Sequence, residues 1–114
     1  MAPAKYNLEI NQRATFRRQF RLRDSNGDPI FEAGDEFFAQ FWDDKRRTLF
    51  AEFEITVIDL LTGTIELSLP FTVPRGLTSP GVWDLLLVRS NGDRQYILEG
   101  FVTIDPGYTD TNGV

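Results

Sequence analysis

An Asn-Gly pair near the carboxyl end, Asn91-Gly92, constrains the fold more than any other short stretch of this chain. It lies between two runs rich in β-branched, aromatic and leucine residues, 79–89 and 94–104. Asn-Gly between such runs is the strongest local signal for a β-hairpin. The first run is apolar at nearly every position, which predicts a central strand covered on both faces. The second run alternates, and its apolar face is expected to hold Tyr96, Leu98, Gly100, Val102 and Ile104.

Several upstream segments show the same two-residue period. Strands are predicted over residues 6–10, 15–23, 36–42, 49–53, 54–60 and 64–69, with 54–60 continuing the sheet of 49–53. In the first of these, Tyr6, Leu8 and Ile10 are expected to point inward. About seven or eight short strands, separated by turn signals roughly every ten residues, predict an all-β, antiparallel sandwich. The alternative is a small closed barrel.

The length and composition fit one folded domain. At 114 residues the chain can bury one core. We expect a single β-sandwich domain over residues 1–105 and a C-terminal tail or arm over 106–114, which has no core-forming pattern. No apolar run approaches the roughly 20 residues of a membrane span. The first residues lack the apolar core of a secretion signal, so we expect synthesis in the cytosol.

The charge pattern points to a protein partner. The net charge of −5 argues against a nucleic-acid binder, which is usually basic. Four polar residues of the second predicted strand, however, project on one face: Arg17, Gln19, Arg21 and Arg23. Arginine forms planar, bidentate bonds with carboxylates, so this strip is a candidate docking surface for an acidic partner. The alternatives are an exposed sheet face that guards an edge strand, or a phosphate contact.

Residues for catalysis or cofactor binding are scarce. The chain has no His and no Cys, which removes most nucleophile–base pairs and thiolate metal sites. Its carboxylates show no spacing of a paired acid and base. Asp24, Asn26, Asp28 and Asp35 resemble oxygen ligands of a calcium loop, but Pro29 stands where that loop needs Gly, so we interpret 24–29 as a hairpin turn. We therefore predict a non-enzymatic protein with no metal and no cofactor.

Aromatic side chains divide into a core set and a surface set. The core is predicted to contain Phe16, Phe20, Phe37, Phe41, Phe50, Phe53, Trp83 and Phe101. Phe31, Phe38, Trp42 and Phe71 are harder to bury together, and any that are exposed form an apolar patch typical of an interface. Phe38 and Trp42 join the arginine strip as candidate partner-binding residues. Beside Asp43 and Asp44 they would also suit a carbohydrate.

Four segments resemble a family of small virion proteins of tailed bacteriophages. They are the opening strand pair at 6–16, the hairpin at 24–30, the strand at 63–69, and the closing hairpin of 81–87 with 98–104. The chain is similar to the immunoglobulin-like N-terminal domain of phage baseplate upper proteins over roughly residues 6–105. Arg13 replaces the Gly that the family has in its opening turn.

The resemblance implies an immunoglobulin-like fold and a structural role in the virion. The protein would act in tail, baseplate or fibre-attachment assembly, in many symmetric copies that contact other phage structural proteins. Within the same class, the alternative is a capsid decoration (cement) protein; from another class, it is a carbohydrate-binding module. The resemblance carries over no site residue. The expected location is the virion, after synthesis in the host cytoplasm, with no membrane or nucleic-acid partner.

Overall fold

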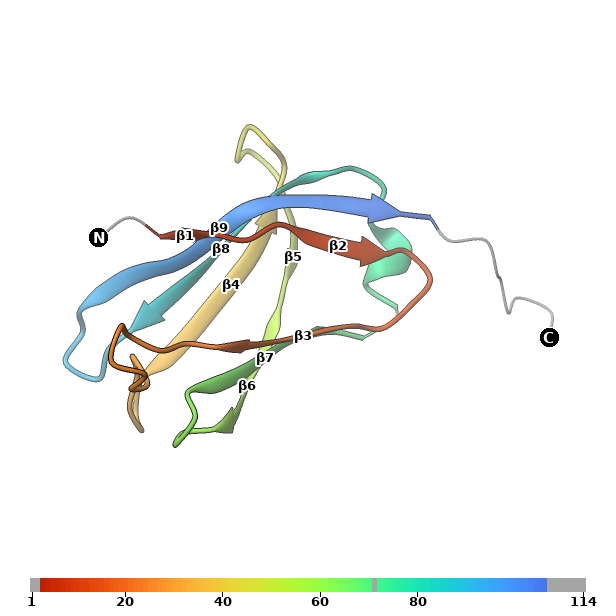
Figure 1. The fold of residues 1–114 in the computed structure, drawn as a ribbon. Helices are drawn as coiled ribbons and strands as arrows, with labels where there is room; N and C mark the ends of the chain where they lie inside the picture. Colours follow the sequence, from red (N-terminus) through yellow and green to blue (C-terminus); the bar gives the residue numbers. More distant parts are fainter. Residues whose placement is uncertain (1–2, 71, 107–114) are drawn as a thin grey trace.

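The structure is a computed structural model and describes residues 3–70 and 72–106. This part of the chain contains nine strands and one short 3-10 helix (Figure 1). The strands are β1 (Ala4–Lys5), β2 (Leu8–Asn11), β3 (Phe16–Arg21), β4 (Glu36–Trp42), β5 (Leu49–Glu52), β6 (Glu54–Asp59), β7 (Thr64–Leu69), β8 (Gly81–Val88) and β9 (Arg94–Asp105). The 3-10 helix covers Pro74–Gly76.

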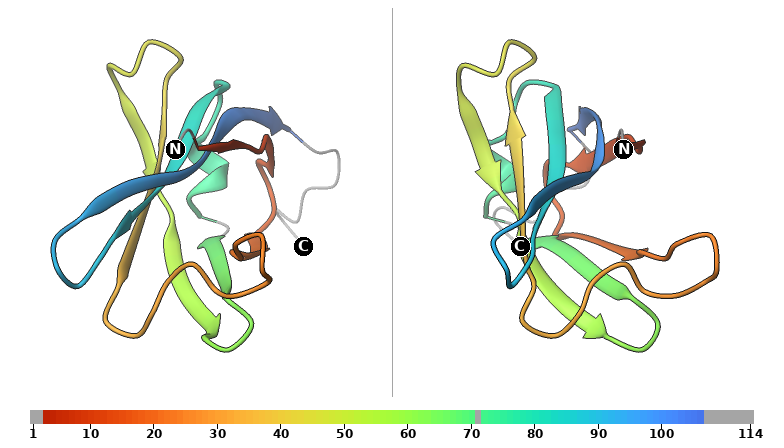
Figure 2. Two further views of the ribbon diagram at one scale, coloured as in Figure 1. Left: turned by 60° about the vertical axis from the view of Figure 1, so that its left-hand side comes forward. Right: turned by 90° about the vertical axis from the view of Figure 1, so that its left-hand side faces the viewer.

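The strands form two sheets that face each other across one core. A three-stranded antiparallel sheet has the order β3-β7-β6, and a six-stranded sheet has the order β1-β9-β8-β4-β5 with β2 also paired to β9. Figure 2 follows the long connection, in orange, that leaves β3 in one sheet and enters β4 in the other. The first strand thus lies beside the last, as in an immunoglobulin-like sandwich. The predicted fold class is confirmed, although β1 and β2 run parallel to β9 in an otherwise antiparallel arrangement.

The core follows the alternation in the sequence. On β7, Ile65, Leu67 and Leu69 are buried, and on β4 the predicted inward residue Phe41 is fully buried. Trp83 of β8 lies between the sheets, with ring centroids 6.0 Å from Phe20 and 6.2 Å from Phe53. Phe31, which the sequence left as hard to bury, is only 3% exposed. Phe71 and the arm from residue 107 onward lie outside the described residues.

The chain changes sheets at Phe53, where the sequence predicted one continuous sheet. β5 pairs with β4, whereas β6 pairs with β7 in the other sheet. Phe53 is buried between them, and its N–H donates to the carbonyl of Ala39 at 2.9 Å. An aromatic side chain at the crossing gains more burial between two sheets than on one of them. The prediction that 54–60 continues the sheet of 49–53 is therefore wrong.

A β-bulge in β9 overturns part of the predicted hairpin face. Leu85 pairs with Leu98 but Leu86 pairs with Tyr96, so Ile97 is the extra residue. One extra residue inverts the alternation on one side of it. Tyr96 is consequently exposed while Leu98 is buried, although both were expected on one face. Phe101, predicted in the core, is exposed because its neighbours Gly100 and Val102 are the inward residues.

The first strand is broken at Tyr6, which the sequence predicted as an inward residue. Tyr6 is more than one-third exposed, although its ring edge still contacts Phe20 at a centroid distance of 4.9 Å. The Tyr6 carbonyl turns inward and accepts a hydrogen bond of 2.7 Å from Nε1 of buried Trp83. The backbone here passes directly over Gly100, where a Cβ would lie 2.0 Å from the Tyr6 oxygen. Gly100 therefore permits the contact that satisfies the indole N–H.

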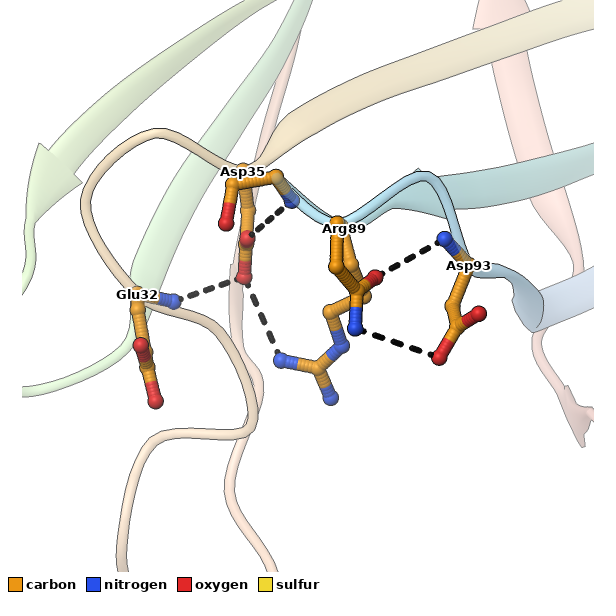
Figure 3. A network of polar contacts seen from close by, with 6 residues as sticks. Glu32, Asp35, Arg89 and Asp93 are labelled. Carbon is orange, nitrogen blue, oxygen red and sulfur yellow. Dashed lines mark hydrogen bonds and ion pairs between the residues drawn. The ribbon is translucent and has the colours of Figure 1, made fainter.

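The loop that precedes β4 is fastened to the β8–β9 turn by one carboxylate (Figure 3). Asp35 accepts hydrogen bonds from the backbone N–H of Glu32 at 2.9 Å and of Ser90 at 3.0 Å. Arg89 Nη1 also donates to Asp35, at 3.2 Å. The hydrogen bond from the Glu32 N–H, with smaller contributions from Ser90 and Arg89, lowers the pKa of Asp35 below its ordinary 3.8. Asp35 is therefore a structural anchor of this loop, and both of its carboxylate oxygens already accept hydrogen bonds.

Candidate interaction surfaces

The outer face of the six-stranded sheet carries two apolar rows. Strand pairing places Phe38, Leu86 and Tyr96 side by side in one row, and Trp42, Val82 and Phe101 in another. Phe38 is 49% exposed, Tyr96 51% and Phe101 66%, and the other three are partly buried. We call these six residues the aromatic face. The sequence predicted that both faces of β8 are covered, but its outer side chains Val82, Asp84 and Leu86 are only partly buried.

A polar row separates the two apolar rows. It runs across the whole sheet through Glu52, Gln40, Asp84, Glu99 and Lys5. Gln40 Nε2 donates to Glu52 at 2.8 Å, and Trp42 Nε1 donates to Gln40 Oε1 at 2.9 Å. Lys5 pairs with Glu99 at the other end. The row contains three carboxylates and one ammonium, so the row itself carries a net negative charge.

Asp84 occupies the middle of this row. Its partial burial between the apolar rows raises the pKa of its carboxyl above the ordinary 3.8, and nearby Glu99 acts in the same direction. The positive charge of Arg46 opposes the shift but does not cancel it. A half-buried carboxylate with a raised pKa gains from a new hydrogen-bond donor or cation. Asp84 is thus the polar position at which a partner could gain specificity.

Shallow hollows on this face lie next to Asp84. One of about 280 Å³ is lined by Gln40, Trp42, Arg46, Val82, Trp83, Asp84 and Tyr96. A second of about 250 Å³ lies between Phe38, Asp84 and Arg94. Both combine ring surfaces with a few polar groups, which is the make-up of small recognition sites. Asp43, which the sequence offered as a sugar ligand, does not line them.

Asp43 is used inside its own loop. Its Oδ1 accepts the backbone N–H of Arg47 at 2.5 Å and of Thr48 at 3.0 Å. The hydrogen bond from Thr48 is the main reason that the pKa of Asp43 lies below 3.8. The loop also holds Arg46 at φ 57°, a left-handed conformation that non-glycine residues rarely adopt. The carboxylate therefore holds this turn, whose Arg46 lines the hollow beside Trp42.

The arginine strip lies on the other sheet. Arg17, Gln19 and Arg21 point outward from β3 and are exposed, while Phe16 and Phe20 point into the core. Gln19 Nε2 donates to Glu66 of β7 at 3.2 Å. Arg23 lies beyond the end of β3, and its Nε donates to the carbonyl of Thr62 at 2.9 Å. We call Arg17, Gln19 and Arg21 the arginine row.

Five of the six predicted partner-binding residues therefore divide between two surfaces, and the sixth, Arg23, lies beyond the end of β3. Phe38 and Trp42 belong to the aromatic face, and the arginine row belongs to the outer face of the opposite sheet. Sequence reasoning missed Tyr96 and Phe101 because it placed both inside, and it missed Asp84 because a carboxylate in an apolar run gives no sign of its neighbours. The register of the strands, which brings these residues together, was the missing information.

The turn that resembles a calcium loop is held together by its own carboxylate. Asp24 Oδ1 accepts the backbone N–H groups of Asn26 at 2.9 Å and Asp28 at 3.0 Å, which closes the turn interpreted above as a hairpin. Among residues 3–70 and 72–106, no group of three or more acidic side chains is arranged to bind a metal. No helix within the same residues is long and apolar enough to span a bilayer.

Comparisons with known proteins add a structural neighbour but no family. No family model matches the chain, and no curated protein sequence matches it. Among solved structures, the crystal structure of the Lin-41 filamin domain is similar, at 16% sequence identity and a TM-score of 0.41. The match covers 87% of this chain and 84% of that one. The assignment of an immunoglobulin-like sandwich rests on the strand order described above.

Proposed function

We propose that the protein is a non-enzymatic assembly module of a bacteriophage particle, acting in the tail, baseplate or fibre attachment. The observation that supports this proposal most is the aromatic face, which presents Phe38, Tyr96 and Phe101 to solvent on the outer face of the six-stranded sheet. Contiguous exposed aromatic side chains mark protein interfaces, and aromatic anchors dominate their binding energy. The resemblance to baseplate proteins supplies the biological setting of the proposal.

The chemistry of the aromatic face defines the partner. Two apolar rows flank Asp84, so the complementary surface carries apolar side chains on both sides of an Arg or Lys. A neighbouring virion protein with that pattern would bury the rings and neutralise the carboxylate. A capsid decoration protein would use the face in the same way, and the copy number in the particle separates the two roles.

The first test is the protein content of purified phage particles, measured by quantitative mass spectrometry. Copies on the order of dozens indicate a tail or baseplate component, and on the order of hundreds a capsid component. Absence of the chain from particles would refute both roles. The second test is incorporation of Phe101→Ser, with Asn26→Ser, an exposed residue of the turn at 24–28 outside the six-stranded sheet, as the control. We expect the first variant to be excluded and the control to be incorporated.

A carbohydrate-binding module is the second candidate, because the hollow beside Asp84 combines Trp42 and Tyr96 with polar side chains. Sugars stack their apolar faces on rings while carboxylates and amides bind the hydroxyls. A glycan-array signal that Trp42→Ala abolishes would favour this function. The absence of any glycan signal from the wild-type chain would leave the assembly role alone.

A further inference from the structure

The three-stranded sheet has two open edges of opposite charge. β3 and β6 both pair with the central strand β7, and no described strand pairs with their other sides. β3 carries Arg17 and Arg21 on the outer face of this sheet, whereas β6 carries Glu54 and Asp59. We call Glu54, Thr56 and Asp59 the acidic edge. Opposite charges at the two edges are the condition for head-to-tail contact between copies.

The register aligns the two edges row by row. Arg17 and Glu54 both pair with Ser68, and Gln19 and Thr56 both pair with Glu66. Arg21 and Asp59 both pair with Thr64. Across the sheet, each arginine of the arginine row on β3 is therefore level with a carboxylate on β6, and Gln19 is level with the hydroxyl of Thr56.

These charges are available to a partner. Within the described part of the chain, Arg17, Arg21 and Glu54 take part in no ion pair, and all three are exposed. Asp59 uses one oxygen to accept the N–H of Leu61 at 2.9 Å, and its other oxygen accepts no hydrogen bond from the described residues. A charged side chain without an intramolecular ion pair has no such pair to break when it binds a partner, so binding does not include that free-energy cost.

The β6 edge also exposes apolar side chains. Val57 is 43% exposed and Ile58 48%, and the following turn exposes Leu60 at 43% and Leu61 at 89%. An exposed apolar edge strand pairs readily with another strand unless charges such as lysine or arginine prevent it. The arginines of β3 oppose its pairing with a second β3, whereas β6 carries no basic residue and is interrupted only by the register shift between Val57 and Asp59.

We propose that the three-stranded sheet continues from one copy of the chain into the next, with β6 of one copy added to β3 of a second copy. β3 and β6 run in the same direction, because both are antiparallel to β7. If the second copy is displaced sideways, in the plane of the sheet and perpendicular to the strands, its β3 lies parallel to β6 of the first copy. The residue pairs that share a partner on β7 within one copy then face each other between copies. Glu54 then faces Arg17 of the second copy, Thr56 faces its Gln19, and Asp59 faces its Arg21.

Charge excludes the symmetric alternatives. Two β6 strands paired antiparallel about their middle would oppose Glu54 to Asp59, and two β3 strands paired antiparallel about Gln19 would oppose Arg17 to Arg21. Like charges directly opposite each other destabilise a strand pair. The head-to-tail arrangement alone pairs each acid with a base, and it leaves an open edge at each end of the assembly.

A groove beside β3 accommodates the apolar turn of the neighbour. It has a volume of about 860 Å³ and runs from Arg21 to Ser25 on one side and along Gln95–Leu98 on the other. Its lining includes the apolar side chains of Ile30, Ile97 and Leu98. In the proposed arrangement Asp59 of one copy faces Arg21 of the second copy. Leu60 and Leu61, which follow Asp59, therefore lie next to the groove of the second copy, which begins at its Arg21.

The proposal is tested with two charge-reversed variants of the purified chain. Arg17→Glu/Arg21→Glu makes both edges acidic. Glu54→Arg/Asp59→Asn removes the acidic edge, and its asparagine keeps an oxygen for the Leu61 N–H. Sedimentation velocity over a range of concentrations is expected to show association of the wild type and at least about a tenfold loss of affinity in each variant alone. An equimolar mixture of the two variants is expected to associate again, because each edge then meets a complementary one.

Controls distinguish this contact from others. Lys45→Glu reverses an exposed loop charge away from both edges and is expected to associate as the wild type does. Equal urea midpoints for all variants show that the fold is intact. A wild type that stays monomeric up to on the order of 1 mM would overturn the proposal. So would association that survives both charge reversals, or that Phe101→Ser abolishes instead. The experiment uses no phage component, so its outcome is separate from that of the assembly role.

Discussion

Gly100→Ala tests the close contact between the first strand and β9. In the native structure a Cβ at this position lies 2.0 Å from the oxygen and 2.6 Å from the carbon of the Tyr6 carbonyl. Both contacts are with backbone, so no rotamer change relieves them. The segment around Tyr6 must move away, which removes the acceptor of Trp83 Nε1 and the hydrogen bond from the Phe101 N–H to Asn7 Oδ1 at 2.9 Å.

The expected loss is the sum of two effects. Overpacking of this kind costs about 1–3 kcal/mol, and a buried indole N–H without an acceptor costs about 1–3 kcal/mol more. A loss near 4 kcal/mol is large against the roughly 6–17 kcal/mol expected for the stability of a chain of this size. With a urea m value of about 2 kcal/mol/M, the unfolding midpoint should fall by about 2 M.

Urea denaturation followed by tryptophan fluorescence measures this midpoint. Gly76→Ala is the matched control, since a Cβ there meets no atom within 4 Å, and it should change stability by less than about 1 kcal/mol. Trp83→Phe removes the same hydrogen bond from its donor side, so the double variant should lose less than the sum of the single losses. A Gly100→Ala protein within about 1 kcal/mol of the wild type would refute the reasoning.

Three further outcomes follow from individual side chains. Because the folded pKa of Asp35 is lowered, its contribution to stability is present above the unfolded value of 3.8 and is lost as the pH falls through the folded value. Asp35→Asn should therefore be less stable near neutral pH, with a smaller further loss below pH 3.8 when unfolding is measured against pH. For Asp84 the folded pKa is raised, so the wild type should gain stability as the pH falls through that value, and Asp84→Asn should be more stable than the wild type near pH 7 and lack this gain. Phe101→Ser should leave the urea midpoint nearly unchanged, since the ring is 66% exposed, and a drop of more than about 1 kcal/mol would show that it packs in the core after all.

Alternation in the sequence predicts the strands whose two faces differ in polarity. On β4, Phe37, Ala39 and Phe41 were expected opposite Phe38 and Trp42, and the structure places them so. On β9, the same reasoning fails because the residues on both sides of the bulge are apolar. A two-residue period places Tyr96 and Leu98 on the same face of the strand. Only the pairing with β8 shows that Ile97 is an extra residue between them.

Contacts between distant segments decide the rest. The segment from Leu49 to Ile58 contains no signal for the sheet in which each half lies, because burial in either sheet satisfies the same apolar side chains. The candidate surfaces have the same character. Phe38 and Trp42 could be placed on the outer face of their strand, but the polar row through Asp84 and the matching rows of β3 and β6 exist only once three strands are in register.

The parallel pairing of β2 with β9 gives the domain a mechanical axis. Leu8 stands beside Val102 and Asn11 beside Asp105, so the two strands run the same way along one shared ladder. If the chain is pulled from β1 and from the C-terminal end of β9 in opposite directions, the force runs along the two parallel strands. It then acts in shear on all the hydrogen bonds between β2 and β9 at the same time. A force applied across the ladder would break its bonds one after another. The sandwich should therefore resist stretching along this axis far better than peeling, a useful property for a part under load.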